Sequence, residues 1–220
     1  VPHEVQAEAL EALKATRAKG YGAGLVVLAT GLGKTYLAAF DSRQAHRILF
    51  VAHREEILTQ AMTAFRAVRP KSRLGRYGNG ATEADADIVF ASVQTLGREA
   101  HLERFAADDF DYIVVDEFHH AAAATYRRII DPFTPDFLLG LTATPDRSDG
   151  GDLLGLCEEN LVYTCDLWSG IDRGLLSPFK YFGVPDPVEY AQIPWRSGKF
   201  DEAALTEAVA TRARAENALD

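Results

Sequence analysis

Short uninterrupted apolar runs alternate with amphipathic stretches over residues 3–141. The runs lie at residues 25–28, 48–51, 88–91, 112–115 and 137–141, and residues 74–77 form a weaker predicted strand before a Gly-Asn-Gly turn. Apolar runs of this length without polar alternation are typical of strands buried on both faces. Between them, residues 3–19, 34–46, 57–65, 95–106 and 121–130 have the composition or spacing of helices. The alternation predicts an α/β fold with a mostly parallel central sheet and helices on both faces.

The pattern changes after Pro145, where prolines, glycines and polar residues become frequent. The expected elements are a loop at 146–152, strands at 161–164 and 179–184 around a short helix, an extended segment at 185–194 and an Ala-rich helix at 201–219. We therefore expect a core domain at residues 1–147. Residues 148–220 are expected to be its C-terminal extension and a linker.

Three short strings directly follow predicted strands or end them. They are Ala29-Thr30-Gly31-Leu32-Gly33-Lys34-Thr35, Asp116-Glu117-Phe118-His119 and Leu141-Thr142-Ala143-Thr144-Pro145. The carboxyl ends of parallel strands meet at one edge of a sheet, where ligands bind in such folds. Three strings of this chemistry in this order predict a nucleotide-driven motor.

The first string is a variant of the phosphate-loop pattern G-x-x-x-x-G-K-[ST], with Leu28 at the position of the first glycine. Gly31 and Gly33 let backbone N–H groups curl around an anion at a helix N-terminus. Lys34 would reach the outer phosphates, and the Thr35 hydroxyl would ligate Mg²⁺. The alternative is a Gly-rich strand-to-helix turn with an incidental lysine.

The second and third strings carry candidates for hydrolysis and its coupling. Asp116 can hold Mg²⁺, and Glu117 would orient or deprotonate the attacking water. His119 would hydrogen-bond across to the third string, whose Thr142 and Thr144 could link the hydrolysis site to the rest of the domain. The alternatives are an acidic surface turn and a plain threonine turn before proline.

Two further strand ends carry polar residues suited to a nucleic-acid backbone. His53-Arg54 follows one strand, and the residues Ser92, Gln94 and Thr95 follow another. Five basic residues without an acid lie between Arg66 and Arg76. They form either a basic track, with Arg69 and Arg73 extending the first group, or a solvated charged loop. The formal net charge of −9 argues against a protein covered in positive charge, although a local track is compatible with it.

On these residues the chain resembles the first motor domain of superfamily 2 DExH-box helicases, in the branch of the restriction subunits of type I and type III systems. ATGLGKT is similar to motif I, VAHREEIL to motif Ia, ASVQTL to the next nucleic-acid motif, DEFHH to motif II and GLTATP to motif III. The resemblance covers roughly residues 2–147. It implies a RecA-like phosphate-loop domain that couples ATP hydrolysis to movement on DNA, with ATP and Mg²⁺ as cofactors.

The resemblance also implies roles for single residues. Gln6, in the segment beginning Pro2-His3, would contact adenine. The ATP-binding residues would be Gln6, Thr30, Gly31, Leu32, Gly33, Lys34 and Thr35. The motifs of the second motor domain are absent from this sequence, so the partner implied is a second RecA-like domain in a longer chain. Without its arginine, the fragment is expected to bind nucleotide and hydrolyse it poorly.

The lengths of the apolar runs and the number of cysteines bear on the location and partners of the protein. No apolar run approaches the ~18 residues of a membrane span, so no membrane partner is expected. Two cysteines, Cys157 and Cys165, indicate a reducing, cytoplasmic location rather than a disulfide framework. Two alternatives to a DNA motor remain, namely an RNA helicase with the same engine and a non-motor ATP-dependent switch that binds a protein.

Overall fold

The computed structural model describes residues 1–78, 80–116, 123–144, 153–180, 190–196 and 199–209. The chain divides into two compact units, Val1–Ser177 and Pro178–Asp220. The first unit contains all the predicted motifs. Its glutamate at position 117 and histidine at 119 lie outside the described residues, as does Pro145.

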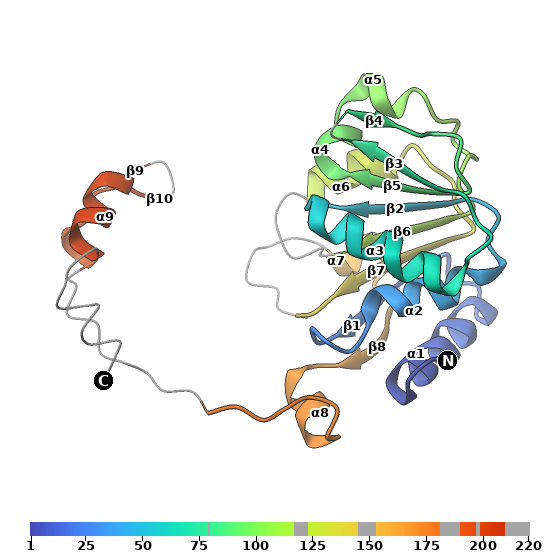
Figure 1. Ribbon diagram of the computed structural model, residues 1–220, viewed down its shortest axis with the longest axis horizontal. Helices are drawn as coiled ribbons and strands as arrows, with labels where there is room; N and C mark the ends of the chain where they lie inside the picture. Colours follow the sequence, from blue (N-terminus) through green and yellow to red (C-terminus); the bar gives the residue numbers. More distant parts are fainter. Residues whose placement is uncertain (79, 117–122, 145–152, 181–189, 197–198, 210–220) are drawn as a thin grey trace. The chain divides into compact units, whose positions relative to one another are not determined.

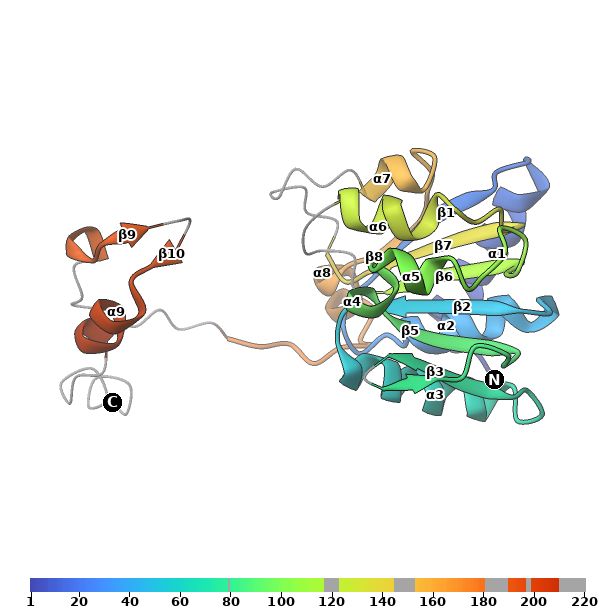
Figure 2. The same cartoon turned by 90° about the horizontal axis from the view of Figure 1, so that it is seen from above.

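The first unit is built on an eight-stranded sheet in the order β4-β3-β5-β2-β6-β7-β1-β8 (Figures 1 and 2). The strands are β1 (Ala23–Leu28), β2 (Ile48–Ala52), β3 (Leu74–Gly78), β4 (Ala81–Thr82), β5 (Ile88–Ser92), β6 (Tyr112–Asp116), β7 (Phe137–Thr142) and β8 (Leu161–Cys165). Every pairing is parallel except that of β3 with the short edge strand β4. The predicted α/β fold with a mostly parallel sheet is confirmed.

Helices cover both faces of this sheet, as the apolar runs predicted. One core cluster joins the sheet to α1 (Glu4–Ala18), α2 (Lys34–Asp41) and α3 (Glu55–Val68). The second cluster joins it to α4 (Val93–Leu96), α5 (Glu99–Leu102), α6 (Ala123–Ile130) and α7 (Leu153–Leu156). Successive residues of β1 alternate between the two clusters, so the whole strand is buried. That is why these strands read as continuous apolar runs.

Two predicted helices are shorter in the structure. The helix expected at 95–106 is wrong as one element, because α4 ends at Leu96 and Arg98 is extended, with φ −94° and ψ 126°, before α5 begins. The helix expected at 34–46 ends at Asp41 and continues as a 3-10 turn, η1 (Ser42–Gln44). Helical composition did not show these ends, because tertiary contacts decide where a short helix stops.

The first unit continues past residue 147. β8 pairs with β1, and the short helix α8 (Leu167–Asp172) follows it. The strand expected at 179–184 is absent at Phe179 and Lys180, and its other residues lie outside the described ones. The first unit ends at Ser177, before these two residues. Treating residues 148–220 as extension and linker stays a prediction.

The described part of the second unit is small. It comprises the 3-10 turn η2 (Tyr190–Gln192), a hairpin of β9 (Trp195–Arg196) with β10 (Lys199–Phe200), and α9 (Glu202–Val209). The rings of Trp195 and Phe200 pack edge to face at 4.6 Å. The prediction of an extended segment at 185–194 is wrong at residues 190–192, which form the turn η2. Within the described residues, none of the helices has the length and apolar character needed to cross a bilayer.

Candidate nucleotide site and nucleic-acid edge

The loop between β1 and α2 turns at two glycines with positive φ. Gly31 has φ +94° and Gly33 has φ +76°, a region that residues with a Cβ rarely adopt. A Cβ on Gly33 would lie 2.3 Å from Nε2 of Gln6, so this position also needs glycine for space. Gly33 is the N-cap of α2, and the N–H groups that open a helix favour anions. This backbone is the kind that a phosphate cradle requires.

The candidate catalytic side chains lie at the carboxyl ends of neighbouring strands. β7, which ends in Thr142, pairs with β1 on one side and with β6 on the other. Asp116 at the end of β6 is 3% exposed, and Thr142 is fully buried. Lys34, the first residue of α2, donates from Nζ to the carbonyl oxygen of Leu28 at 3.1 Å. The fold therefore brings the first and third strings and Asp116 to one edge.

The oxygen atoms available at this edge fit a magnesium ion. Thr35 lies half-buried in the first turn of α2, and Asp116 offers a buried carboxylate. Hydroxyl and carboxylate oxygens are hard ligands of the kind that Mg²⁺ takes together with water and phosphate.

The third string closes a small turn on itself. Thr142 Oγ1 donates to the carbonyl oxygen of Thr144 at 2.9 Å and accepts from its N–H at 3.3 Å. These two bonds hold Thr144 against the end of β7. Its predicted bond to His119, and the predicted role of Glu117, fall on residues outside the described ones.

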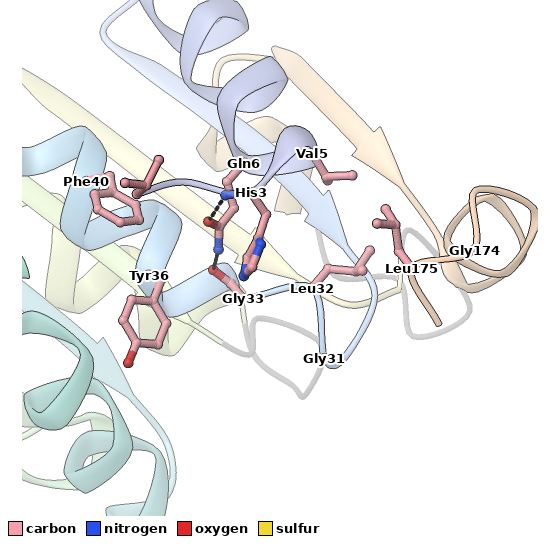
Figure 3. Close-up of a pocket in the computed structure, with 11 residues that line it drawn as sticks. His3, Val5, Gln6, Gly31, Leu32, Gly33, Tyr36, Phe40, Gly174 and Leu175 are labelled. Atoms are coloured by element: carbon pink, nitrogen blue, oxygen red, sulfur yellow. Dashed lines mark hydrogen bonds between the residues drawn. The ribbon is translucent and has the colours of Figure 1, made fainter. Parts of the chain in front are cut away.

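A cavity of about 590 Å³ opens beside the phosphate loop, between α1, α2 and the segment after α8 (Figure 3). Figure 3 shows Tyr36 and Phe40 of α2 at one end and Leu175 near Leu32 at the other. Its lining residues are Val1, His3, Val5, Gln6, Gly31, Leu32, Gly33, Tyr36, Phe40, Gly174 and Leu175. A mostly apolar lining with a few polar groups is typical of pockets for small-molecule ligands. Thr30, which the sequence placed in the nucleotide-binding loop, has an exposed side chain and is not among these lining residues.

Gln6 is the buried polar side chain of this cavity, at 2% exposure. Its Oε1 accepts from the N–H of His3 at 2.9 Å, and its Nε2 donates to the carbonyl oxygen of Gly33 at 3.1 Å. These bonds fix the amide orientation between α1 and the phosphate loop. Beyond these two bonds, the Gln6 amide has a second N–H and a second acceptor position on its oxygen. An adenine edge, which carries one donor and one acceptor, would need that combination.

A second cavity, of about 450 Å³, lies at the carboxyl ends of β2 and β5. It joins His53 to the group Ser92, Gln94 and Thr95, as the strand-end argument predicted. Gln94 Nε2 donates to the carbonyl oxygen of His53 at 2.9 Å, and Ser92 Oγ donates to Thr95 Oγ1 at 2.8 Å. Arg54 follows the cavity residue His53 in the sequence, and its side chain is exposed.

The predicted extension of this edge by Arg69 and Arg73 is wrong. Arg69 donates to the carbonyl oxygens of Ser42 and Ala45 at 2.6 and 2.9 Å, and Arg73 pairs with Asp87 at 3.2 Å. These partners precede β2 and β5, at the opposite edge of the sheet. Both arginines therefore tie loops together, and a count of basic residues in sequence could not show which edge they reach.

Several lining residues were not found from the sequence. Tyr36 and Phe40 are four apart on α2 immediately after the loop, and that spacing was a usable signal for a shared helix face. Gly174 and Leu175 carried no signal, because only the fold brings the segment after α8 to the loop. Arg98 and His101 line the second cavity and likewise needed the structure.

The fold and the site define a RecA-like phosphate-loop domain, since a mostly parallel sheet with this loop after β1 and an acid at the end of β6 is the arrangement of that class. Residues 1–147 match the family described as "Type III restriction enzyme, res subunit". The chain belongs to this family, which confirms the resemblance to the restriction-subunit branch of superfamily 2.

Relatives and solved structures support the same placement. The chain is 32% identical over 215 residues to the type I restriction enzyme EcoAI endonuclease subunit of Escherichia coli, covering 90% of this chain and 26% of that protein. It is 30% identical over 159 residues to the DNA 3'-5' translocase XPB2 of Sulfurisphaera tokodaii, covering 67% and 31%. A nuclease-deletion mutant of the type ISP restriction-modification enzyme LlaGI, in complex with a DNA substrate mimic, superposes with a TM-score of 0.60 at 15% identity, covering 79% of this chain and 20% of that one. That similarity shows the fold alone. The chain spans about a third or less of these proteins.

Proposed function

We propose that this chain is the ATP-binding motor domain of a superfamily 2 DNA helicase or translocase, which couples ATP hydrolysis to movement on DNA. One observation carries the proposal: the phosphate loop, the buried Asp116 and the Thr142 turn meet at the carboxyl ends of three adjacent strands. The family supports it, and the relative XPB2 is named a DNA translocase.

In this proposal each residue of the edge has one task. Lys34 leaves the Leu28 carbonyl and donates to the outer phosphates, and Gly31 and Gly33 present backbone N–H groups to them. Thr35 and Asp116 hold Mg²⁺, which when bound offsets the negative charge of the phosphates. Glu117 orients the water and accepts its proton. His119, Thr142 and Thr144 transmit the state of the site to the rest of the domain.

The base would occupy the 590 Å³ cavity, with Gln6 reading the adenine edge. Thr30 and Leu32 would line the phosphate loop on either side of Gly31. DNA would lie at the other end of the same sheet edge, on His53, Arg54, Ser92, Gln94 and Thr95. Contacts of this kind fix the register of the backbone and do not read sequence.

Two further parts of the proposal concern the whole protein. A second RecA-like domain of a longer chain would supply the arginine that completes the site, so the fragment alone should hydrolyse ATP poorly. A cytoplasmic location is proposed on the two cysteines, which are free and buried.

The test separates binding from hydrolysis. A fluorescent ATP analogue with Mg²⁺ is titrated into the parent and into Lys34→Ala, Glu117→Gln and Lys71→Ala, with melting curves for each. Lys71 lies on an exposed loop before β3 and is the control. Lys34→Ala should weaken binding roughly 10- to 100-fold by removing charge-assisted hydrogen bonds, with little change in melting. Glu117→Gln should bind like the parent.

In the full-length protein, Glu117→Gln should lower steady-state ATP turnover by ~10²–10⁴, the range for losing a general base. Parent-like affinity of Lys34→Ala would sink the assignment of the loop. Unaltered turnover of Glu117→Gln would assign the water to another residue.

A further inference from the structure

The segment after α8 folds back on its own helix. Asp166 caps the helix by accepting from the N–H of Ser169 at 2.8 Å. Gly174 has φ +68°, the left-handed conformation that ends many helices. The next two N–H groups, of Leu175 and Leu176, both donate to the carbonyl oxygen of Gly170, at 2.9 and 3.0 Å. The turn is therefore fixed relative to α8.

This turn forms one wall of the nucleotide cavity. Gly174 and Leu175 line it directly. Leu176 packs on the phosphate loop, since a Cβ on Gly31 would be 3.2 Å from its Cδ2. Figure 3 shows Leu175 and Gly174 on the far side of the loop from Tyr36 and Phe40. The position of α8 therefore sets the shape of the cavity.

Arg173, the last residue before this turn, connects α8 to α1, which forms another wall of the cavity. Its guanidinium donates to both carboxylate oxygens of Glu8 on α1, at 2.7 and 3.0 Å, and to Glu4 at 3.2 Å. It also donates to the Tyr163 hydroxyl at 3.2 Å, and that hydroxyl donates to Glu8. α1 is the helix that carries Gln6. The Arg173 side chain therefore links the turn after α8 to α1, the helix that carries the buried Gln6 amide.

The contacts of Arg173 shift the pKa values of two of its partners. Hydrogen bonds from Arg173 and then Tyr163 lower the pKa of the Glu8 carboxyl to about 2. Burial, followed by the bond to Glu8, raises the pKa of Tyr163 to about 12. The Arg173 side chain is 31% exposed and Glu8 is 42% exposed. A partly exposed network contributes little to global stability, so its effect should be local.

We propose that Arg173 is a positioning residue for the base side of the nucleotide cavity. By holding α8 to α1 it keeps Gly174 and Leu175 at a fixed distance from Gln6, so the cavity is already shaped for a base before a nucleotide binds. Walls ordered in advance do not have to be ordered at binding, which improves affinity. The inference rests on the proposed function, because it assumes that the cavity takes the base of ATP.

The experiment compares two ligands, Mg-ATP and Mg-tripolyphosphate, by titration calorimetry. The variants are Arg173→Gln, Arg173→Lys and the control Arg47→Gln. Arg47 pairs with Asp109 at similar exposure, 29% and 26%, but precedes β2 at the other edge of the sheet. Arg173→Gln should weaken Mg-ATP roughly 3- to 10-fold and leave tripolyphosphate unchanged, because the phosphate loop itself is intact.

Arg173→Lys keeps one charged contact with Glu8 and should recover part of the affinity for Mg-ATP. Glu8→Gln should repeat the effect of Arg173→Gln, and the double variant should add little to either, as expected for partners in one network. The control should bind both ligands like the parent.

Equal weakening of both ligands by Arg173→Gln would overturn the inference, because it would show a general loss of structure. So would parent-like affinity of Arg173→Gln for Mg-ATP, or an equal effect of Arg47→Gln. If the parent binds neither ligand, the proposed function fails and the inference fails with it. If the parent binds both and only the Arg173 result is negative, the proposed function stands alone.

Discussion

Cys157 lies against β7, where a Cβ on Gly140 would be only 2.8 Å from its Sγ. Burial raises the pKa of its thiol to about 12, from 9.0. Because the thiolate is the reactive form, this shift makes Cys157 less reactive near pH 8 than an exposed thiol. Cys165 is also buried, and its pKa is raised by burial.

We predict that both thiols fail to react with a disulfide reagent at pH 8 while the protein is folded, and react at once in denaturant. The raised pKa of Cys157 contributes to stability below pH 9, and this contribution is lost as the pH rises toward 12. Reaction is followed by absorbance. Fast labelling of the folded protein would show that the region around β7 opens readily.

At the scale of elements, α1 and α2 are tied through a buried carboxylate. Asp41, at the end of α2, accepts from both ends of the Arg17 guanidinium at 2.6 and 2.7 Å and from the buried hydroxyl of Tyr112. The Asp41 side chain is 2% exposed and that of Arg17 is 35% exposed. These helices carry Gln6 and Lys34, so the pair fixes the two sides of the nucleotide site.

Asp41→Asn should lower the free energy of unfolding by roughly 1–3 kcal/mol, less than for a fully buried pair because Arg17 is partly in water. Urea denaturation measures the loss. Arg73→Gln removes an ion pair exposed by 72% and 36% and should change the stability by less than about 0.5 kcal/mol. Equal losses in the two variants would contradict this account of the buried contact.

The loops after β2 and β5 form the proposed DNA contact. They are joined by the hydrogen bond from Gln94 to the His53 carbonyl oxygen. We predict that Arg54→Ala and Gln94→Ala weaken DNA binding for any sequence, and that Arg54→Ala lowers the slope of affinity against salt by about 1. Single- and double-stranded DNA are titrated at two salt concentrations.

Arg73→Ala is the matched control for this measurement, since Arg73 lies at the opposite edge of the sheet. Parent-like binding by both edge variants, or binding insensitive to salt, would place the track elsewhere. A clear preference for RNA of the same sequence would favour the RNA helicase, and no binding of either polymer would favour the non-motor switch.

At the scale of the whole molecule, all the residues that line the two cavities belong to the unit Val1–Ser177. We predict that residues 1–177 alone unfold cooperatively and bind Mg-ATP within about twofold of the 220-residue chain, because a compact domain with its own core can fold alone. Calorimetry and titration of the two lengths measure this. A tenfold weaker affinity of the shorter chain would show that residues after 177 contribute to the site.

The sequence by itself determined the sheet and the place of its chemistry. Strands buried on both faces must be apolar throughout, so β1, β2, β5, β6 and β7 were legible as runs. Because parallel strands end at one edge, the residues after them had to gather there, and Lys34, Asp116 and Thr142 do.

Only the tertiary structure decided what surrounds that edge. Arg69 and Arg73 read as free cations until their partners at the opposite edge were seen. Arg173 and Leu175 carried no pattern, since their roles depend on α8 meeting α1 across more than 160 residues of sequence. Local propensity and periodicity report what a segment does within itself, whereas contacts between distant segments are set by packing of the whole core.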